Sequence, residues 1–127
     1  MNIAIWIFQG ILAFTMLATG FLKLASNKEQ FKASGKGNLD WVDSLTPTQL
    51  KLIGVVETLI GVGLILPQLL GLQLWLTPVA AIGAIITMIG AFVLHIKRGD
   101  DFKSIATNFS IMGLASIVLY GRIDFLG

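Results

Sequence analysis

Residues 54–61, Gly54-Val55-Val56-Glu57-Thr58-Leu59-Ile60-Gly61, place a single carboxylate inside a long apolar run. No residue of opposite charge stands beside Glu57 in the sequence. Moving a carboxylate into hydrocarbon costs about 2.5 kcal/mol or more on insertion scales. Such a residue faces the interior of a helix bundle, finds a partner, or carries a proton. The organisation of the chain therefore depends on what surrounds Glu57.

The composition indicates the class of protein. Hydrophobic residues make up 55% of the 127 residues and charged residues only 13%, whereas a soluble domain carries about 25% charged residues. So few charges cannot cover a water-facing surface, and we predict an integral membrane protein in contact with the lipid bilayer. The net charge of +2 is too small to indicate a nucleic-acid partner. Because the chain has no cysteine and one histidine, we expect no disulfide and no metal site.

Four apolar runs are each long enough to span a membrane, which takes about 20 residues. They cover residues 3–25, 47–66, 75–96 and 102–120. Thr46 is a good N-cap before Pro47 at the first helical position, and we expect Pro67 to end the second span. The connections are short except the first. We therefore predict an all-α, integral membrane up-down four-helix bundle that forms a single domain over residues 1–127.

The segment between the first two spans, residues 26–46, is the only long polar stretch. Phe31 and Trp41 lie among its charged residues, and Gly35 and Gly37 interrupt it. We interpret it as a short amphipathic segment that lies on the membrane surface, with Trp41 anchored at the interface. The alternative interpretation is a solvated loop.

The basic residues predict the orientation of the bundle. The side with the first and third loops carries all but one of them, namely Lys23, Lys28, Lys32, Lys36, Lys51, Lys97, Arg98 and Lys103. The opposite side carries only Arg122. Because cytoplasmic loops are rich in lysine and arginine, we predict that these two loops are cytoplasmic and that both termini lie outside.

Small residues recur on the face of the second span that carries Glu57. The face carries three small residues, Gly54, Thr58 and Gly61, which lie three or four residues from Glu57 or from one another. Small residues mark helix–helix contacts in membranes. We therefore expect Glu57 to point into the bundle, and Ile60 to face lipid.

Each span places one polar residue in the cytoplasmic half of the bundle; these residues are Lys23, Glu57, His95 and Asn108. We predict that all four line one cavity that binds a small ligand. Other interpretations remain open for each of them. Lys23 either snorkels to the interface or pairs with Glu57, and His95 is either a site residue or a plain helix-end residue. Asn108 is either a ligand group or an interhelical hydrogen bond, and Glu57 either handles protons or only locks packing.

The chain also resembles the DoxX-like family of small bacterial membrane proteins. The resemblance covers nearly the whole chain and is carried by Gly20-Phe21-Leu22-Lys23-Leu24, Ile53-Gly54-Val55-Val56-Glu57, Leu64-Ile65-Leu66-Pro67, Leu76-Thr77-Pro78, His95-Ile96-Lys97-Arg98-Gly99, Asn108 and Tyr120-Gly121-Arg122. It implies a four-helix protein of the bacterial cytoplasmic (inner) membrane. The family is named after a subunit associated with thiosulfate:quinone oxidoreductase, and some members are linked to quinones or oxidative stress. The resemblance therefore implies a quinone or another lipophilic molecule as ligand.

Three functions fit these expectations. The first is a module that binds a quinone-like molecule or serves a membrane redox complex beside a partner oxidoreductase subunit. The second is a proton-coupled transporter of a lipophilic compound, which needs a homo-oligomer because four helices are few for alternating access. The third is a purely structural subunit. No covalent cofactor is expected, and whether the chain is catalytic is left open.

Overall fold

The computed structural model describes residues 2–34, 40–100 and 102–126, and the side chains of Asn2, Asp40 and Trp41 lie outside the description. The described residues form helices and no strand: α1 (Asn2–Ala25), α2 (Lys28–Ser34), the 3₁₀ helix η1 (Asp40–Ser44), α3 (Pro47–Leu70), α4 (Leu76–Arg98), α5 (Phe102–Arg122) and the 3₁₀ helix η2 (Ile123–Leu126). Helices α1, α3, α4 and α5 are long and apolar enough to cross a membrane. The predicted helical membrane bundle is confirmed.

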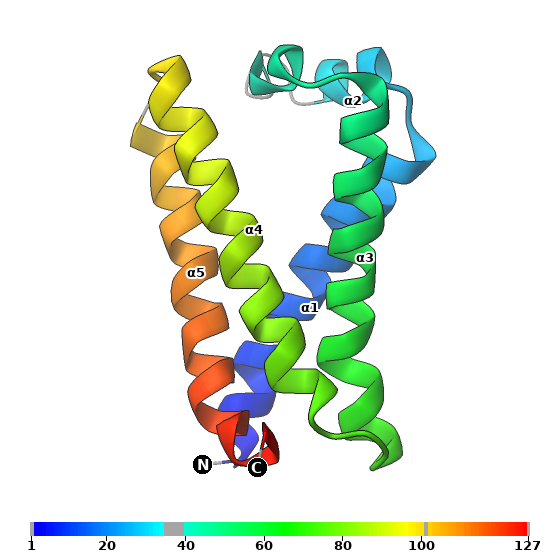
Figure 1. Ribbon diagram of the computed structural model, residues 1–127, viewed down its shortest axis with the longest axis vertical. Helices are drawn as coiled ribbons and strands as arrows, with labels where there is room; N and C mark the ends of the chain where they lie inside the picture. The colour runs from blue at the N-terminus through cyan, green and yellow to red at the C-terminus, as the bar shows by residue number, and fades with distance from the viewer. Residues whose placement is uncertain (1, 35–39, 101, 127) are drawn as a thin grey trace.

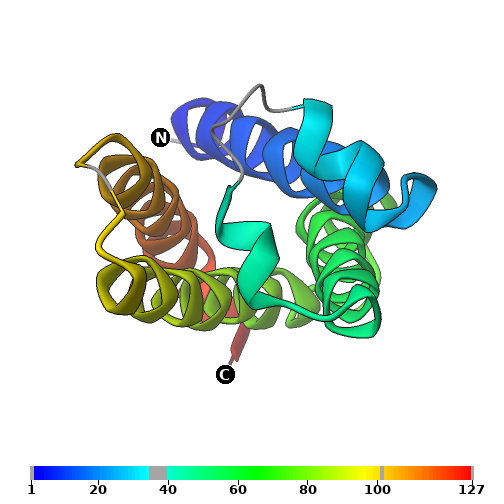
Figure 2. The same ribbon diagram turned by 90° about the horizontal axis from the view of Figure 1, so that it is seen from above.

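The four long helices run alternately up and down (Figure 1). Both termini lie at one end of the bundle, which we call the terminal end. Helix α2, η1 and the turn between α4 and α5 lie at the other, which we call the α2 end. Seen along the bundle, α3 lies between α1 and α4, and α5 closes the ring between α4 and α1 (Figure 2).

Helices α1 and α3 pack closely through glycines. A Cβ atom at Gly54 would lie 2.9 Å from the Cβ of Lys23, and one at Gly61 would lie 2.5 Å from the Cγ of Leu17. Gly20 of α1 is equally tight, because a Cβ there would lie 2.9 Å from the carbonyl oxygen of Gly54. The expectation that Gly54 and Gly61 face a neighbouring helix is confirmed, since only glycine allows backbones to approach this closely.

The expectation that Ile60 faces lipid is wrong. Ile60 is buried and lies 3.4 Å from where a Cβ of Gly83 on α4 would be. Consecutive helical residues point about 100° apart. Helix α3 has a neighbour on each of two sides, so Gly61 can face α1 while Ile60 faces α4.

Helix α3 begins as expected but ends later. The Thr46 side chain accepts a hydrogen bond from the Gln49 amide and the Gln49 side chain caps Thr46 in return, which confirms the predicted start. Pro67 does not end the helix, which continues to Leu70. Pro67 has no N–H for the Gly63 carbonyl, and the Thr77 hydroxyl of α4 donates to that carbonyl at 3.4 Å instead. This substitute donor explains how the proline is accommodated.

The main core lies in the part of the bundle where all four long helices meet. Its fully buried members include Leu12, Met16, Leu64, Ala81, Ala84 and Val118. Towards the α2 end the pair α1–α3 separates from the pair α4–α5, and α2 and η1 lie across this end of the bundle (Figures 1 and 2). A second small core of Phe31, Val42 and Leu50 holds this covering segment on α3. The predicted amphipathic segment thus contains a short helix whose Phe31 packs inward. The predicted anchoring of Trp41 lies outside the described side chains, and contact of the segment with the membrane surface stays a prediction.

Candidate functional site

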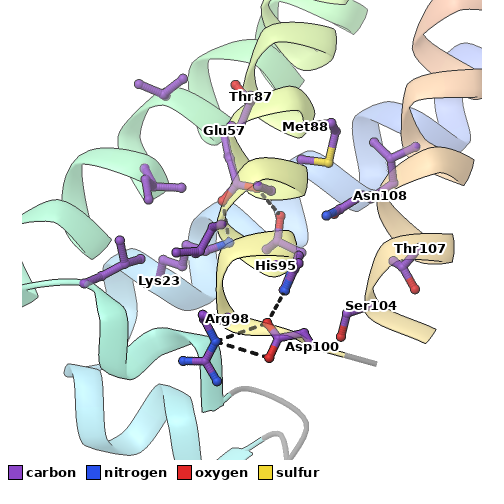
Figure 3. A pocket seen from close by; sticks show the side chains of 18 of the residues that line it. Lys23, Glu57, Thr87, Met88, His95, Arg98, Asp100, Ser104, Thr107 and Asn108 are labelled. Carbon is purple, nitrogen blue, oxygen red and sulfur yellow. Dashed lines mark hydrogen bonds and ion pairs between the residues drawn. The ribbon is translucent and has the colours of Figure 1, made fainter. Parts of the chain in front are cut away.

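A cavity of about 1060 Å³ lies at the α2 end between the two helix pairs. Its wall includes side chains of α1, α2, α3, α4 and α5. The four residues singled out in the sequence, Lys23, Glu57, His95 and Asn108, all line it and are all buried (Figure 3). The structure therefore brings together residues that lie up to 85 positions apart, since 108 − 23 = 85.

Lys23 and Glu57 form a buried ion pair in the wall of the cavity. The Lys23 Nζ lies 2.5 Å from the Glu57 Oε1, and the two residues are 5% and 4% exposed. The Thr19 hydroxyl donates to the other carboxylate oxygen, Oε2, at 3.2 Å. The Phe31 ring of α2 lies 5.4 Å from the same Nζ. Lys23 therefore does not snorkel to the interface but provides the opposite charge that the sequence does not place beside Glu57.

His95 belongs to a second polar cluster at the α2 end of the cavity. Its Nδ1 lies 2.6 Å from the Asp100 Oδ2, and the Arg98 Nε donates to the same oxygen at 3.1 Å. Gly99 adopts a left-handed conformation with φ 71°, which turns the chain so that Asp100 reaches back to His95. The hydrogen bond from His95, followed by that from Arg98, holds the pKa of the Asp100 carboxyl below its ordinary value of 3.8.

Asn108 differs from these groups, because no hydrogen-bond partner for its amide nitrogen lies among the described residues. The residue is 7% exposed and lines the cavity from α5. Figure 3 shows the amide pointing from α5 towards Met88 and His95 of α4. A buried N–H group without a partner costs about 1–3 kcal/mol. Rotation about the last side-chain bond is soft, so the amide can turn towards a hydrogen-bond acceptor in the cavity.

Comparison with known proteins identifies the family of the chain. The family model described as the DoxX-like family matches residues 7–118, which is nearly the whole chain. The chain belongs to the DoxX-like family. The resemblance noted from the sequence motifs is thereby confirmed. No match is found among curated proteins or among solved structures.

The DoxX-like chain also contains a polar cluster that the sequence did not reveal. At the terminal end, the Arg122 Nε donates to the Gln9 Oε1 at 2.9 Å, and the Gln9 amide nitrogen donates to the Leu64 carbonyl. The Arg122 guanidinium lies 5.3 Å from the Trp6 ring. Because Arg122 is buried, it takes part in the packing of the terminal end. This cluster is separate from the cavity, which none of its residues line.

The site of this DoxX-like protein thus combines two ion-paired clusters with the buried Asn108 amide, whose nitrogen has no partner among the described residues. In the part of the chain that the structure describes, no three histidine or acidic side chains gather where they could hold a metal ion. The charges of Glu57 and Asp100 are compensated within the wall. The Asn108 amide is a buried group that a ligand can satisfy. Sequence reasoning missed Asp100 because its contact depends on the turn at Gly99, although its place directly after a helix-ending glycine is a usable signal.

Proposed function

We propose that this DoxX-like protein binds a quinone-like lipophilic molecule in the cavity, on its own or as a small subunit of a membrane redox complex. The observation that carries the proposal is the buried Asn108 amide, which lacks a partner among the described residues. A quinone carbonyl is an acceptor that would satisfy it. For any redox step, a partner oxidoreductase subunit or a soluble reductant supplies the electrons.

The dimensions and lining of the cavity support a ligand of this kind. Small-molecule sites are typically cavities of about 300–1,000 Å³ lined mostly by apolar groups, with a few placed polar ones. This cavity has a volume of about 1060 Å³, and its wall combines the apolar residues Ile53, Leu94 and Ile111 with the polar residues described above. We assign Asn108 as the donor to the ligand. We assign the Lys23–Glu57 pair and His95 to the wall against which the ring rests.

The Lys23–Glu57 pair weighs against proton-coupled transport through Glu57. That function needs a carboxyl that exchanges its proton during the cycle. In this structure an ammonium group lies 2.5 Å from the carboxylate, and the Thr19 hydroxyl donates to it. The pair instead holds one positive and one negative charge at set positions in the wall that α1 and α3 form.

We also propose that the α2 end faces the cytoplasm of a bacterial cell, across its cytoplasmic membrane. The basic residues support this orientation, because the described lysines and the arginine of the two charged loops lie at this end: Lys28, Lys32, Lys51, Lys97, Arg98 and Lys103. Cytoplasmic loops carry such an excess. A ligand ring bound near Asn108 would then lie in the cytoplasmic half of the membrane.

The test of the proposed function is mass spectrometry of small molecules that remain with the protein after gentle purification. The parent should retain a lipophilic molecule that carries a carbonyl, and Asn108→Leu should lose most of it. Ser116→Ala is the matched control on α5, because its exposed hydroxyl donates to the Met112 carbonyl of the same helix and Ser116 does not line the cavity. Equal retention by the parent and by Asn108→Leu, or retention of no such molecule by either, would reject the proposal.

A further inference from the structure

We infer that the ligand carries a hydrocarbon chain that leaves the cavity between α3 and α4, and that the ligand therefore enters from the bilayer. This inference rests on the proposed function and adds the class of ligand, an amphiphile with an acceptor at its head and a single apolar tail.

The cavity is open between α3 and α4 because these helices touch only deeper in the bundle. Their close contacts are Gly63 with Ala80, where a Cβ on the glycine would lie 3.1 Å from the alanine Cβ, and Ile60 with Gly83. Beyond these contacts the two helices diverge towards the α2 end (Figure 1). The cavity is lined from α3 by residues 52, 53, 56 and 57, which all lie on the α2 side of Ile60.

The pairs α1–α3 and α4–α5 are closed at the same depth. The Lys23–Glu57 pair and the contact of Gly20 with Gly54 join α1 to α3. The rings of Phe92 and Phe109 meet at 5.1 Å between α4 and α5. The pair α1–α5 also separates towards the α2 end (Figure 1), but the residues of these two helices that line the cavity are mostly polar: Thr19 and Lys23 of α1, and Lys103, Ser104, Thr107 and Asn108 beside Ile111 of α5. A hydrocarbon chain therefore finds its apolar path between α3 and α4.

The side chains at the edges of this opening are both apolar and exposed. Leu52 and Val56 of α3 line the cavity and are 59% and 45% exposed, and Ile86 of α4 lines it and is 63% exposed. On the side of a membrane-spanning helix, an exposed side chain of this type faces lipid. The opening therefore joins the cavity to the hydrocarbon of the bilayer, without a polar group at these three positions.

The route from water past α2 and η1 is covered in this structure. The Arg98 Nη1 donates to the Ser44 hydroxyl at 3.2 Å and so joins α4 to η1. The Lys28 Nζ donates to the Leu45 carbonyl at 2.5 Å, which ties α2 to the same segment. Phe31 of α2 lies directly over the cavity, which it lines. Entry from water by this route would require these contacts to open, whereas entry between α3 and α4 does not.

The depth of Asn108, where the head of the ligand would bind, and the depth of Ile86, past which the tail would leave, fit one amphiphile. Asn108 lies six residues into α5, or about 9 Å from its start at the α2 end. Ile86 lies twelve residues before the end of α4, or about 18 Å from that end. A head at Asn108 therefore lies closer to the membrane surface, and a tail that passes Ile86 points towards the middle of the bilayer.

The test compares two tritiated probes on immobilised protein by scintillation proximity: a decyl-substituted benzoquinone, and the same ring with a methyl group in place of the decyl chain. Val56→Trp and Ile86→Trp narrow the opening from its two sides. Val55→Trp and Ile89→Trp are the matched controls, because Val55 and Ile89 are 43% and 49% exposed but do not line the cavity. Size-exclusion profiles establish that each variant is folded, and the two helices provide independent variants.

We expect Val56→Trp and Ile86→Trp to lose about tenfold in affinity for the decyl probe and to bind the methyl probe like the parent. Both controls should bind both probes like the parent. Unchanged affinity for the decyl probe in the two opening variants would overturn the tail path. An equal loss for both probes would also overturn it, because the tryptophan would then occupy the place of the ring. If the parent binds neither probe, the proposed function itself fails, and the inference fails with it.

Discussion

The Lys23 ammonium of α1 lies 2.5 Å from the Glu57 carboxylate of α3, and both residues are at least 95% buried. The pair joins two helices at the point where Gly20 and Gly54 bring their backbones together. Desolvating two charges offsets much of their attraction, so such a pair adds little net stability. Removing one partner is different, because it leaves the other charge buried without compensation.

Glu57→Gln should therefore destabilise the protein by about 3–5 kcal/mol. The double variant Lys23→Met/Glu57→Gln should recover most of this loss, because no buried charge is left unpaired. Thermal unfolding in detergent measures both. A single variant as stable as the parent, or a double variant no better than the single, would mean that the two charges are not coupled as the structure indicates.

Gly61→Leu should destabilise the bundle by about 1–3 kcal/mol through overpacking, because its Cβ would meet the Leu17 side chain at 2.5 Å. Gly113→Leu on α5 is the matched control, since no atom lies within 4 Å of a Cβ at that position. The control should leave the melting temperature nearly unchanged. Equal melting temperatures for the two variants would show that the α1–α3 contact is looser than described.

The Asp100 cluster predicts a pH dependence with a definite sign. The pKa of Asp100 is held below its ordinary value of 3.8, first by the hydrogen bond from His95. A lowered carboxyl pKa contributes stability that is fully present above the ordinary pKa and is lost as the pH falls through the folded value. The difference in melting temperature between the parent and Asp100→Asn should therefore shrink as the pH is lowered through this range. A constant difference for Asp100→Asn would contradict the assignment.

The proposed orientation can be measured with single cysteines, because the chain has none of its own. Lys97→Cys lies at the α2 end and Asp124→Cys at the terminal end. In intact cells, a membrane-impermeant maleimide should label position 124 and leave position 97 unlabelled until the membrane is opened. Labelling of position 97 alone, or of both positions, would contradict a cytoplasmic α2 end.

The sequence predicts more of the fold than of the site. The apolar runs place four membrane-spanning helices, and the helical spacing around Glu57 identifies the face that meets α1. The pairing of Lys23 with Glu57 stayed open because it depends on the approach of Gly20 to Gly54, which the separate periodicities of two helices do not determine. The position of Ile60 and the passage through Pro67 likewise depend on α4, which supplies Gly83 and the Thr77 hydroxyl. Local patterns do not include such partners.

The candidate site, like the fold, could be predicted from the sequence only in part. The four polar positions could be assigned to one half of the bundle from their depths alone. Which of them would already be satisfied could not be predicted, because Asp100 is brought to His95 by the turn at Gly99. Because Lys23, Glu57 and His95 are already paired, we assign the buried Asn108 amide to the ligand.

The central claim is that the Asn108 amide donates a hydrogen bond to a carbonyl in the cavity. The most direct measurement is the infrared carbonyl band of a carbon-13-labelled benzoquinone bound to the parent and to Asn108→Leu, because a donated hydrogen bond lowers the carbonyl stretching frequency. We predict a lowered band in the parent that moves towards the free value in the variant. The ligand-free variant should be at least as stable as the parent, since leucine removes a buried donor that lacks a partner among the described residues. An identical band in both proteins, or a strongly destabilised Asn108→Leu, would contradict the claim and make Asn108 a packing residue.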